Sequence, residues 1–132
     1  MMEPGSQSIL LVEDNLMNQG LIVRQLARLG YEKVAVVGNG KLALEWLASH
    51  TCHLVLADCQ MPVMDGYEMT RRIRENERTC GRRTPIIAVS AGVMDADVHR
   101  CAEAGMDAHI PKPTQLSTLR AVLSKWLGGT DE

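Results

Sequence analysis

Short apolar runs alternate with longer amphipathic segments along this chain, and this alternation limits the folds open to it. Unbroken apolar runs suit parallel strands that are covered by helices on both faces. A repeated strand–helix order predicts a parallel sheet with right-handed crossovers. Five runs have the length of a strand: Ser8–Val12, Lys33–Val37, Leu54–Ala57, Pro85–Val89 and Ala108–Ile110.

Five segments that follow these runs carry the apolar spacing or the end signals of helices. Asn15 can cap the first helix by accepting an unpaired backbone N–H, and Gly30 can end it. The fold class is therefore α/β: a five-stranded parallel sheet of order 2-1-3-4-5 with five helices, in a flavodoxin-like three-layer arrangement. The predicted helices are a segment ending near Leu29, Lys41–Ser49, Tyr67–Arg78, Asp95–Ala104 and a last helix carrying Leu116, Leu119, Leu123 and Trp126.

The length of the chain corresponds to one domain. Its 132 residues can bury a core without disulfides or metal ions. Residues 8–127 are expected to form this domain. Residues 1–7 are expected to be a disordered N-terminal extension or a cloning remnant, and residues 128–132 a C-terminal tail.

Charge and cysteine usage exclude several classes. The formal net charge of −2 gives no indication of nucleic-acid or anionic-membrane binding. Six arginines between residues 71 and 83 alternate with glutamates, which predicts a solvated helix face and loop. No segment approaches the roughly 18 apolar residues that span a bilayer. The four cysteines lack metal-site spacing and indicate reduced thiols, with Cys59 as a packing residue or a reactive thiol.

Polar side chains stand where four of the predicted strands end. Glu13 and Asp14 follow the first strand, and Asp58 follows the third. Ser90 and Lys112 follow the fourth and fifth strands. In a sheet of this order these ends meet at one edge, which is where open α/β sheets bind ligands.

Carboxylates crowded at one edge repel one another unless a cation lies between them. Mg²⁺ prefers oxygen ligands and commonly binds one or two carboxylates together with a phosphate. A carboxylate such as Asp58 can be the nucleophile in phosphoryl transfer, and Lys112 can offset charge on the phosphoryl oxygens. The pattern predicts a metal-assisted phosphoryl-transfer site, although Glu13 and Asp14 taken alone could be exposed loop acids.

Four motifs occur along the chain in a set order. They are Leu11-Val12-Glu13-Asp14-Asn15, Asp58-Cys59-Gln60-Met61-Pro62-Val63-Met64-Asp65-Gly66, Ala88-Val89-Ser90-Ala91 and Lys112-Pro113. Together they resemble the receiver domain of two-component response regulators, and the resemblance covers about residues 8–127.

The resemblance implies a role for each matching acid. Asp58 matches the phosphoacceptor, and Asp14 the acid that contacts Mg²⁺ directly. Glu13 matches its partner acid, which often acts through water, and the main-chain carbonyl of Gln60 matches a further metal ligand. Asp65 is interpreted as structural, since it belongs to the acid–glycine turn after the acceptor strand.

The resemblance also implies a switch. Lys112 matches the lysine that pairs with the phosphoryl group, and the Lys112–Pro113 bond matches one that is usually cis. Ser90 matches the switch hydroxyl, and His109 the switch ring, which is usually Tyr or Phe. Phosphorylation would draw in Ser90 and then His109, changing the face formed by the fourth helix, fifth strand and fifth helix. Whether protonation of His109 biases this equilibrium stays open beside the simpler interpretation of a partly exposed ring without a pH role.

The run from Glu13 to Gln19 and the segment after Asp58 resemble receivers attached to hybrid sensor kinases. The implied partners are a histidine kinase, a histidine phosphotransfer domain or both, in the cytoplasm, with no nucleic acid bound directly. Such a domain catalyses its own phosphorylation and dephosphorylation, and the whole protein could be membrane-anchored. The alternative is a stand-alone single-domain response regulator that acts by protein–protein binding.

Three other classes fit the residues less well. An aspartate-nucleophile phosphatase would need a general acid two residues after Asp58, and Gln60 stands there. A nucleotide-binding module would need a glycine-rich loop after the first strand, and Glu13-Asp14-Asn15 stands there. A phosphorylation-silent receiver would lack part of the site, and every matching residue is present.

Overall fold

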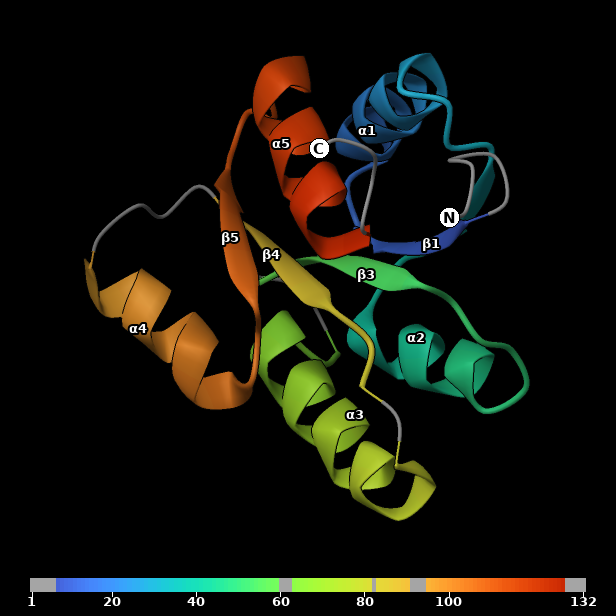
Figure 1. The fold of residues 1–132 in the computed structure, drawn as a ribbon. Helices are drawn as coiled ribbons and strands as arrows, with labels where there is room; N and C mark the ends of the chain where they lie inside the picture. The colour runs from blue at the N-terminus through green and yellow to red at the C-terminus, as the bar shows by residue number, and fades with distance from the viewer. Residues whose placement is uncertain (1–6, 60–62, 82, 91–94, 128–132) are drawn as a thin grey trace.

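The computed structural model describes residues 7–59, 63–81, 83–90 and 95–127. Strands and helices alternate five times along the chain (Figure 1). The expectations for residues 1–6 and 128–132 lie outside the described residues. The elements are β1 (Ser8–Val12), α1 (Leu16–Arg28), β2 (Lys33–Val37), α2 (Gly40–Leu47), β3 (Leu54–Asp58), α3 (Gly66–Cys80), β4 (Ile86–Ser90), α4 (Asp95–Ala104), β5 (Ala108–Pro111) and α5 (Leu116–Leu127).

The five strands form one parallel sheet of order β2-β1-β3-β4-β5, as predicted. The register brings the last residues of neighbouring strands level with one another. Val12 pairs with Ala57, Asp58 with Val89, and Ser90 with Pro111. The carboxyl ends of β1, β3, β4 and β5 therefore lie at the same edge of the sheet.

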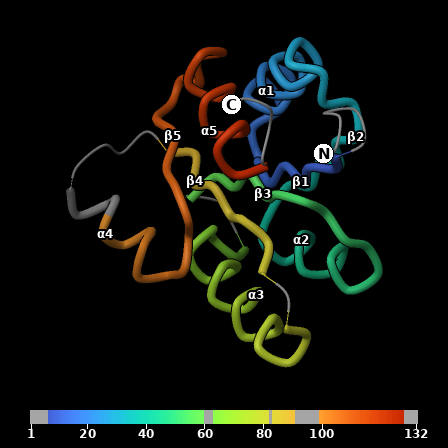
Figure 2. Tube along the Cα trace, in the orientation of Figure 1, coloured from blue at the N-terminus to red at the C-terminus, as the bar shows by residue number. Residues whose placement is uncertain are grey.

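Alternate residues of each strand serve two separate cores. Leu10, Val55 and Ala88 belong to the core beneath α2, α3 and α4. Leu11 and Leu56 belong to the core beneath α1 and α5. The two helical layers lie on opposite faces of the sheet (Figures 1 and 2). Each fully buried leucine contributes about 2 kcal/mol, so the period-two pattern holds the sheet in this register.

Side-chain caps set where the helices begin. Asn15 Oδ1 accepts a hydrogen bond from the Asn18 N–H at 3.0 Å, which confirms the predicted cap of α1. Asn39 caps α2 in the same way, so that helix begins at Gly40 and not at Lys41 as predicted. Asp65 caps α3 by accepting from the Glu68 N–H at 2.9 Å.

The end of α3 differs from the prediction. The helix runs on to Cys80, two residues beyond the predicted end, and Gly81 ends it with φ of 71°. A left-handed residue stops a helix at little cost when it is glycine. The start of the domain also differs slightly, because Gln7 is buried and its Nε2 donates to the Leu127 carbonyl at 3.0 Å.

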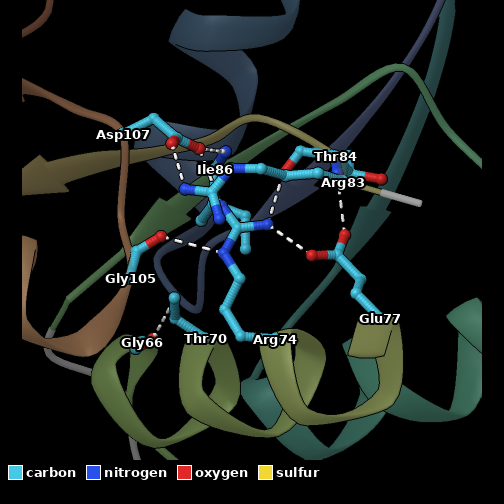
Figure 3. A network of polar contacts seen from close by, with 9 residues as sticks. All are labelled: Gly66, Thr70, Arg74, Glu77, Arg83, Thr84, Ile86, Gly105 and Asp107. Carbon is cyan, nitrogen blue, oxygen red and sulfur yellow. Dashed lines mark hydrogen bonds and ion pairs between the residues drawn. The ribbon is translucent and has the colours of Figure 1, made fainter. Parts of the chain in front are cut away.

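One arginine of the predicted solvated face is instead buried. Arg74 lies beneath the surface with 13 % of its side chain exposed. Its guanidinium donates to the carbonyls of Gly105 and Thr84 and to the carboxylates of Glu77 and Asp107, at 2.7–2.9 Å (Figure 3). The network ties α3 to the segment between α4 and β5 and to the segment before β4, so the prediction of a solvated face was wrong at this position.

The other described basic residues of this segment behave as predicted, and the thiols are reduced. Arg71 and Arg72 are exposed and pair with Glu68. All four cysteines are free. Within the described ranges, no helix combines the length and apolar character that crossing a bilayer requires.

Candidate functional site

The sheet brings the predicted acids together. Carboxylate oxygens of Glu13, Asp14 and Asp58 all lie within 4.8 Å of one another. Glu13 and Asp58 are buried, with 1 % and 5 % of their surfaces exposed, whereas Asp14 is exposed. The burial of Glu13 contradicts the alternative in which Glu13 and Asp14 are a pair of exposed loop acids.

The residues present fit a divalent cation. The Glu13 Oε1 atom is buried and accepts no hydrogen bond from the described residues, while its Oε2 accepts from the Asn15 N–H at 3.1 Å. Burial, with added repulsion from Asp58, raises the pKa of Glu13. A buried carboxylate oxygen without a donor, next to two more carboxylates, is a donor set of oxygen atoms that suits Mg²⁺.

Lys112 contributes a positive charge next to the carboxylates of this site. Its Nζ donates to Asp58 Oδ2 at 3.0 Å and forms an ion pair with Glu13 Oε1 at 3.4 Å. Burial acts to lower the pKa of Lys112, but the hydrogen bond and charge of Asp58, with the charge of Glu13, outweigh it and raise the pKa. The lysine is therefore held protonated beside the acceptor carboxylate.

Backbone contacts fix where Lys112 stands. Its N–H donates to the Ser90 carbonyl at 2.9 Å, which joins β5 to the end of β4. The Lys112–Pro113 bond is cis, as predicted. Ser90 itself is buried, with 5 % of its surface exposed.

His109 lies on β5, which β4 separates from the strand that carries Asp58. It pairs in register with Ala88 on β4, two residues before Ser90. The residue is half-buried, yet its Nε2 is buried and has no hydrogen-bond partner among the described residues. The structure thus places the ring on β5, beside the strand that ends at Ser90. Its role as a switch remains a prediction.

The loop after β3 is held tightly against the acceptor strand. Gly66 N–H donates to the Cys59 carbonyl at 3.1 Å, and a Cβ at Gly66 would lie 2.6 Å from the Asp58 carbonyl oxygen. Only glycine fits there, which explains the acid–glycine pair, and Asp65 is structural as predicted because it caps α3. The predicted carbonyl ligand of Gln60 lies outside the described residues.

Cys59 is a packing residue in the closed domain. Its surface is fully buried, and burial raises its pKa to about 12. A protonated, inaccessible thiol does not act as a nucleophile. The reactive-thiol interpretation therefore does not hold for this conformation.

The fold and the edge cluster define a class of α/β domain that carries its acidic, metal-compatible site at the carboxyl ends of parallel strands. The chain belongs to the response regulator receiver domain family, whose sequence profile matches residues 9–124. This agrees with the resemblance seen in the four motifs.

Two relatives illustrate the context. The chain is 46 % identical over 125 residues to the hybrid signal transduction protein dokA of Dictyostelium discoideum. The match covers 94 % of this chain but 7 % of dokA. The chain is 37 % identical over 116 residues to the sensor histidine kinase RcsC of Salmonella typhimurium, covering 88 % of this chain and 12 % of RcsC. The chain thus spans a small part of each of these proteins.

Solved structures share the fold. The receiver domain of the sensor histidine kinase PA1611 from Pseudomonas aeruginosa, with magnesium coordinated in its active-site cleft, is 41 % identical with a TM-score of 0.83, covering 93 % of this chain and 98 % of that one. The Ssk1 receiver domain of Saccharomyces cerevisiae, crystallised with the histidine phosphotransfer protein Ypd1, is 26 % identical with a TM-score of 0.84, covering 91 % and 88 %.

Proposed function

We propose that this domain accepts a phosphoryl group from phosphohistidine onto Asp58. The observation that carries the proposal is the position of the Asp58 carboxylate, hydrogen-bonded to Lys112 at 3.0 Å and grouped with Glu13 and Asp14. An Asp58 oxygen attacks phosphorus, the P–N bond to the imidazole breaks, and an acyl phosphate remains. Lys112 pairs with the new phosphoryl oxygens, and the Ser90 hydroxyl can donate to one of them.

Mg²⁺ fits this chemistry. Glu13, Asp14 and Asp58 would hold the ion, with the Gln60 carbonyl as a further ligand by resemblance. When bound, it would offset the negative charge of the phosphoryl oxygens. The PA1611 receiver, with magnesium in its cleft, supports this assignment.

A protein donor suits the surroundings of the site. Leu16 and Met17 follow β1 and are 79 % and 83 % exposed, and Val63 follows β3 and is 77 % exposed. Leu16 and Met17 begin α1 and Val63 lies on the loop after β3, and exposed apolar side chains that follow the acidic strand ends favour contact with another protein. The Ypd1–Ssk1 complex and the hybrid relatives support a histidine phosphotransfer domain as partner, and a receiver within a cytoplasmic part of a hybrid kinase. Residues 8–127 would form that receiver.

Mass spectrometry after incubation with acetyl phosphate and Mg²⁺ tests the acceptor. The wild type should gain one phosphoryl group that base removes, and Asp58→Asn should gain none. A wild type that gains nothing from either acetyl phosphate or a phosphorylated histidine phosphotransfer protein would contradict the proposal.

The partner surface is tested separately. Met17→Ser should slow transfer from the protein donor and leave acetyl phosphate uptake unchanged. Leu42→Ser, on α2 and 43 % exposed, is the matched control and should change neither rate. Equal effects of the two substitutions would contradict docking beside the site.

A further inference from the structure

Two buried thiols face each other beside the acceptor strand. The sulfur of Cys59, the residue after Asp58, lies 3.8 Å from the sulfur of Cys101 on α4. Both side chains are buried, with 0 % and 3 % of their surfaces exposed. A disulfide needs about 2.05 Å, so the sulfurs must approach by roughly 1.8 Å.

Tyr67 and Arg100 are neighbours of this pair of thiols. The Tyr67 hydroxyl of α3 interacts with the Cys59 thiol. The Arg100 guanidinium, from the residue before Cys101, lies 4.1 Å from the centre of the Tyr67 ring. The Arg100–Tyr67 contact thus joins the residue before Cys101 to a side chain that interacts with Cys59.

The described side chains of the helix that carries Cys101 contribute little apolar surface to the core. Among its side chains that the structure describes, Cys101 and Ala104 are the ones that enter the core, and both are small. Segments with few buried apolar contacts open at lower free energy than the rest of a domain. Opening of α4 would expose Cys101 first and Cys59 next.

We propose that Cys59 and Cys101 are a reversible redox modification site, oxidised by a peroxide to an intramolecular disulfide. With α4 open, the Cys101 sulfur attacks a peroxide oxygen, the O–O bond breaks, and a sulfenic acid and water form. The Cys59 sulfur then attacks the sulfenic sulfur and releases a second water. Two electrons pass from the thiols to the peroxide, and an external dithiol returns them.

The disulfide would link the residue after Asp58 to α4. Drawing the residue after Asp58 toward α4 shifts the acceptor carboxylate relative to Lys112. A displacement near 1 Å can slow a reaction by about 100-fold. This consequence rests on the proposed function, whereas the disulfide itself does not.

Peptide mapping tests the disulfide. The full chain is treated with hydrogen peroxide, its remaining thiols are alkylated, and it is digested without reduction. A linked Cys59–Cys101 peptide that dithiothreitol releases is expected, with Cys52 alkylated after denaturation as the internal control for a buried thiol. Alkylation of both Cys59 and Cys101, or their linkage to Cys52 or Cys80, would overturn the proposal.

Variants test the route through α4. Arg100→Ala removes the contact over Tyr67 and should speed disulfide formation by about two- to fivefold. Arg71→Ala, an exposed arginine on α3, is the matched control and should leave the rate unchanged. An Arg100→Ala rate equal to that of the control would overturn gating by this helix.

Acetyl phosphate uptake tests the consequence. The oxidised protein should take up phosphoryl groups at least about tenfold more slowly than the reduced protein, and Cys101→Ala should show no such dependence on peroxide. Equal rates in the oxidised and reduced wild type would overturn the coupling. If the reduced protein takes up nothing, the proposed function fails, while peptide mapping still decides the disulfide.

Discussion

Replacing Arg74 by methionine should destabilise the domain far more than any other change to the basic segment. Methionine retains the apolar stem of the side chain and removes the guanidinium. The Gly105 and Thr84 carbonyls each lose a donor, and the carboxylates of Glu77 and Asp107 lose a buried counter-charge.

The magnitude follows from what remains after the substitution. Breaking a buried ion pair by removing one partner costs about 3–5 kcal/mol. The lower end applies here, because Glu77 keeps the Thr84 N–H and Asp107 keeps both the Ile86 N–H and Arg83. We expect a loss of about 3 kcal/mol, which corresponds to a fall in Tm of about 10 °C for a chain of this size.

Urea denaturation followed by tryptophan fluorescence measures the free energy of unfolding. Arg72→Met is the matched control, since Arg72 lies on the same helix but is 54 % exposed and pairs with an exposed Glu68. Such surface pairs contribute about 0.5 kcal/mol or less. A loss below about 1 kcal/mol for Arg74→Met, or one equal to that of Arg72→Met, would refute the reasoning from burial.

Three further outcomes are expected. Gly66→Ala should cost about 2 kcal/mol or more, because its Cβ would lie 2.6 Å from the Asp58 carbonyl oxygen, while Gly38→Ala, with 4.0 Å to its nearest atom, should change urea stability little. Burial raises the pKa of Tyr31 above its ordinary 10.0. The contribution of Tyr31 to the free energy of unfolding is therefore present below pH 10 and is lost as pH rises through the folded-state pKa. Tyr31→Phe should flatten the fall in stability above pH 10, and parallel stability curves for the two proteins would contradict this. Mg²⁺ at ten times its Kd should add about 1.4 kcal/mol to the free energy of unfolding, and Asp14→Asn should lose most of that gain; equal gains by calorimetry would count against the site.

The architecture could be predicted because it depends on local patterns. Strand length, apolar character and the positions of caps are properties of neighbouring residues, and β1 and β2 have the bounds that these patterns gave. The ends of α2 and α3 were less predictable. Each is decided by whether one residue, Asn39 or Gly81, takes a cap conformation, and that choice depends on the loop around it.

The gathering of the three acids and Lys112 at one edge could also be predicted, because parallel strands of known order place their carboxyl ends together. The geometry within the site could not. The 3.0 Å contact between Lys112 and Asp58 joins residues 54 positions apart, and the burial of Glu13 depends on how β1 sits between its neighbours. The resemblance predicted the role of the His109 ring, whereas the structure showed that its Nε2 has no hydrogen-bond partner among the described residues.

Two features were decided by the tertiary structure alone. In the sequence Arg74 is one arginine among several, and it becomes a buried junction because Gly105 and Asp107 come within reach of it. Cys59 and Cys101 show no paired spacing, and they meet because α4, which packs against α3 and β5, brings Cys101 to the residue that follows β3. The sequence determined the layers and the edge at which the acids gather, since periodicity and strand order suffice for both. Contacts between distant segments required the folded chain, because they depend on how elements pack and not on what any one segment prefers.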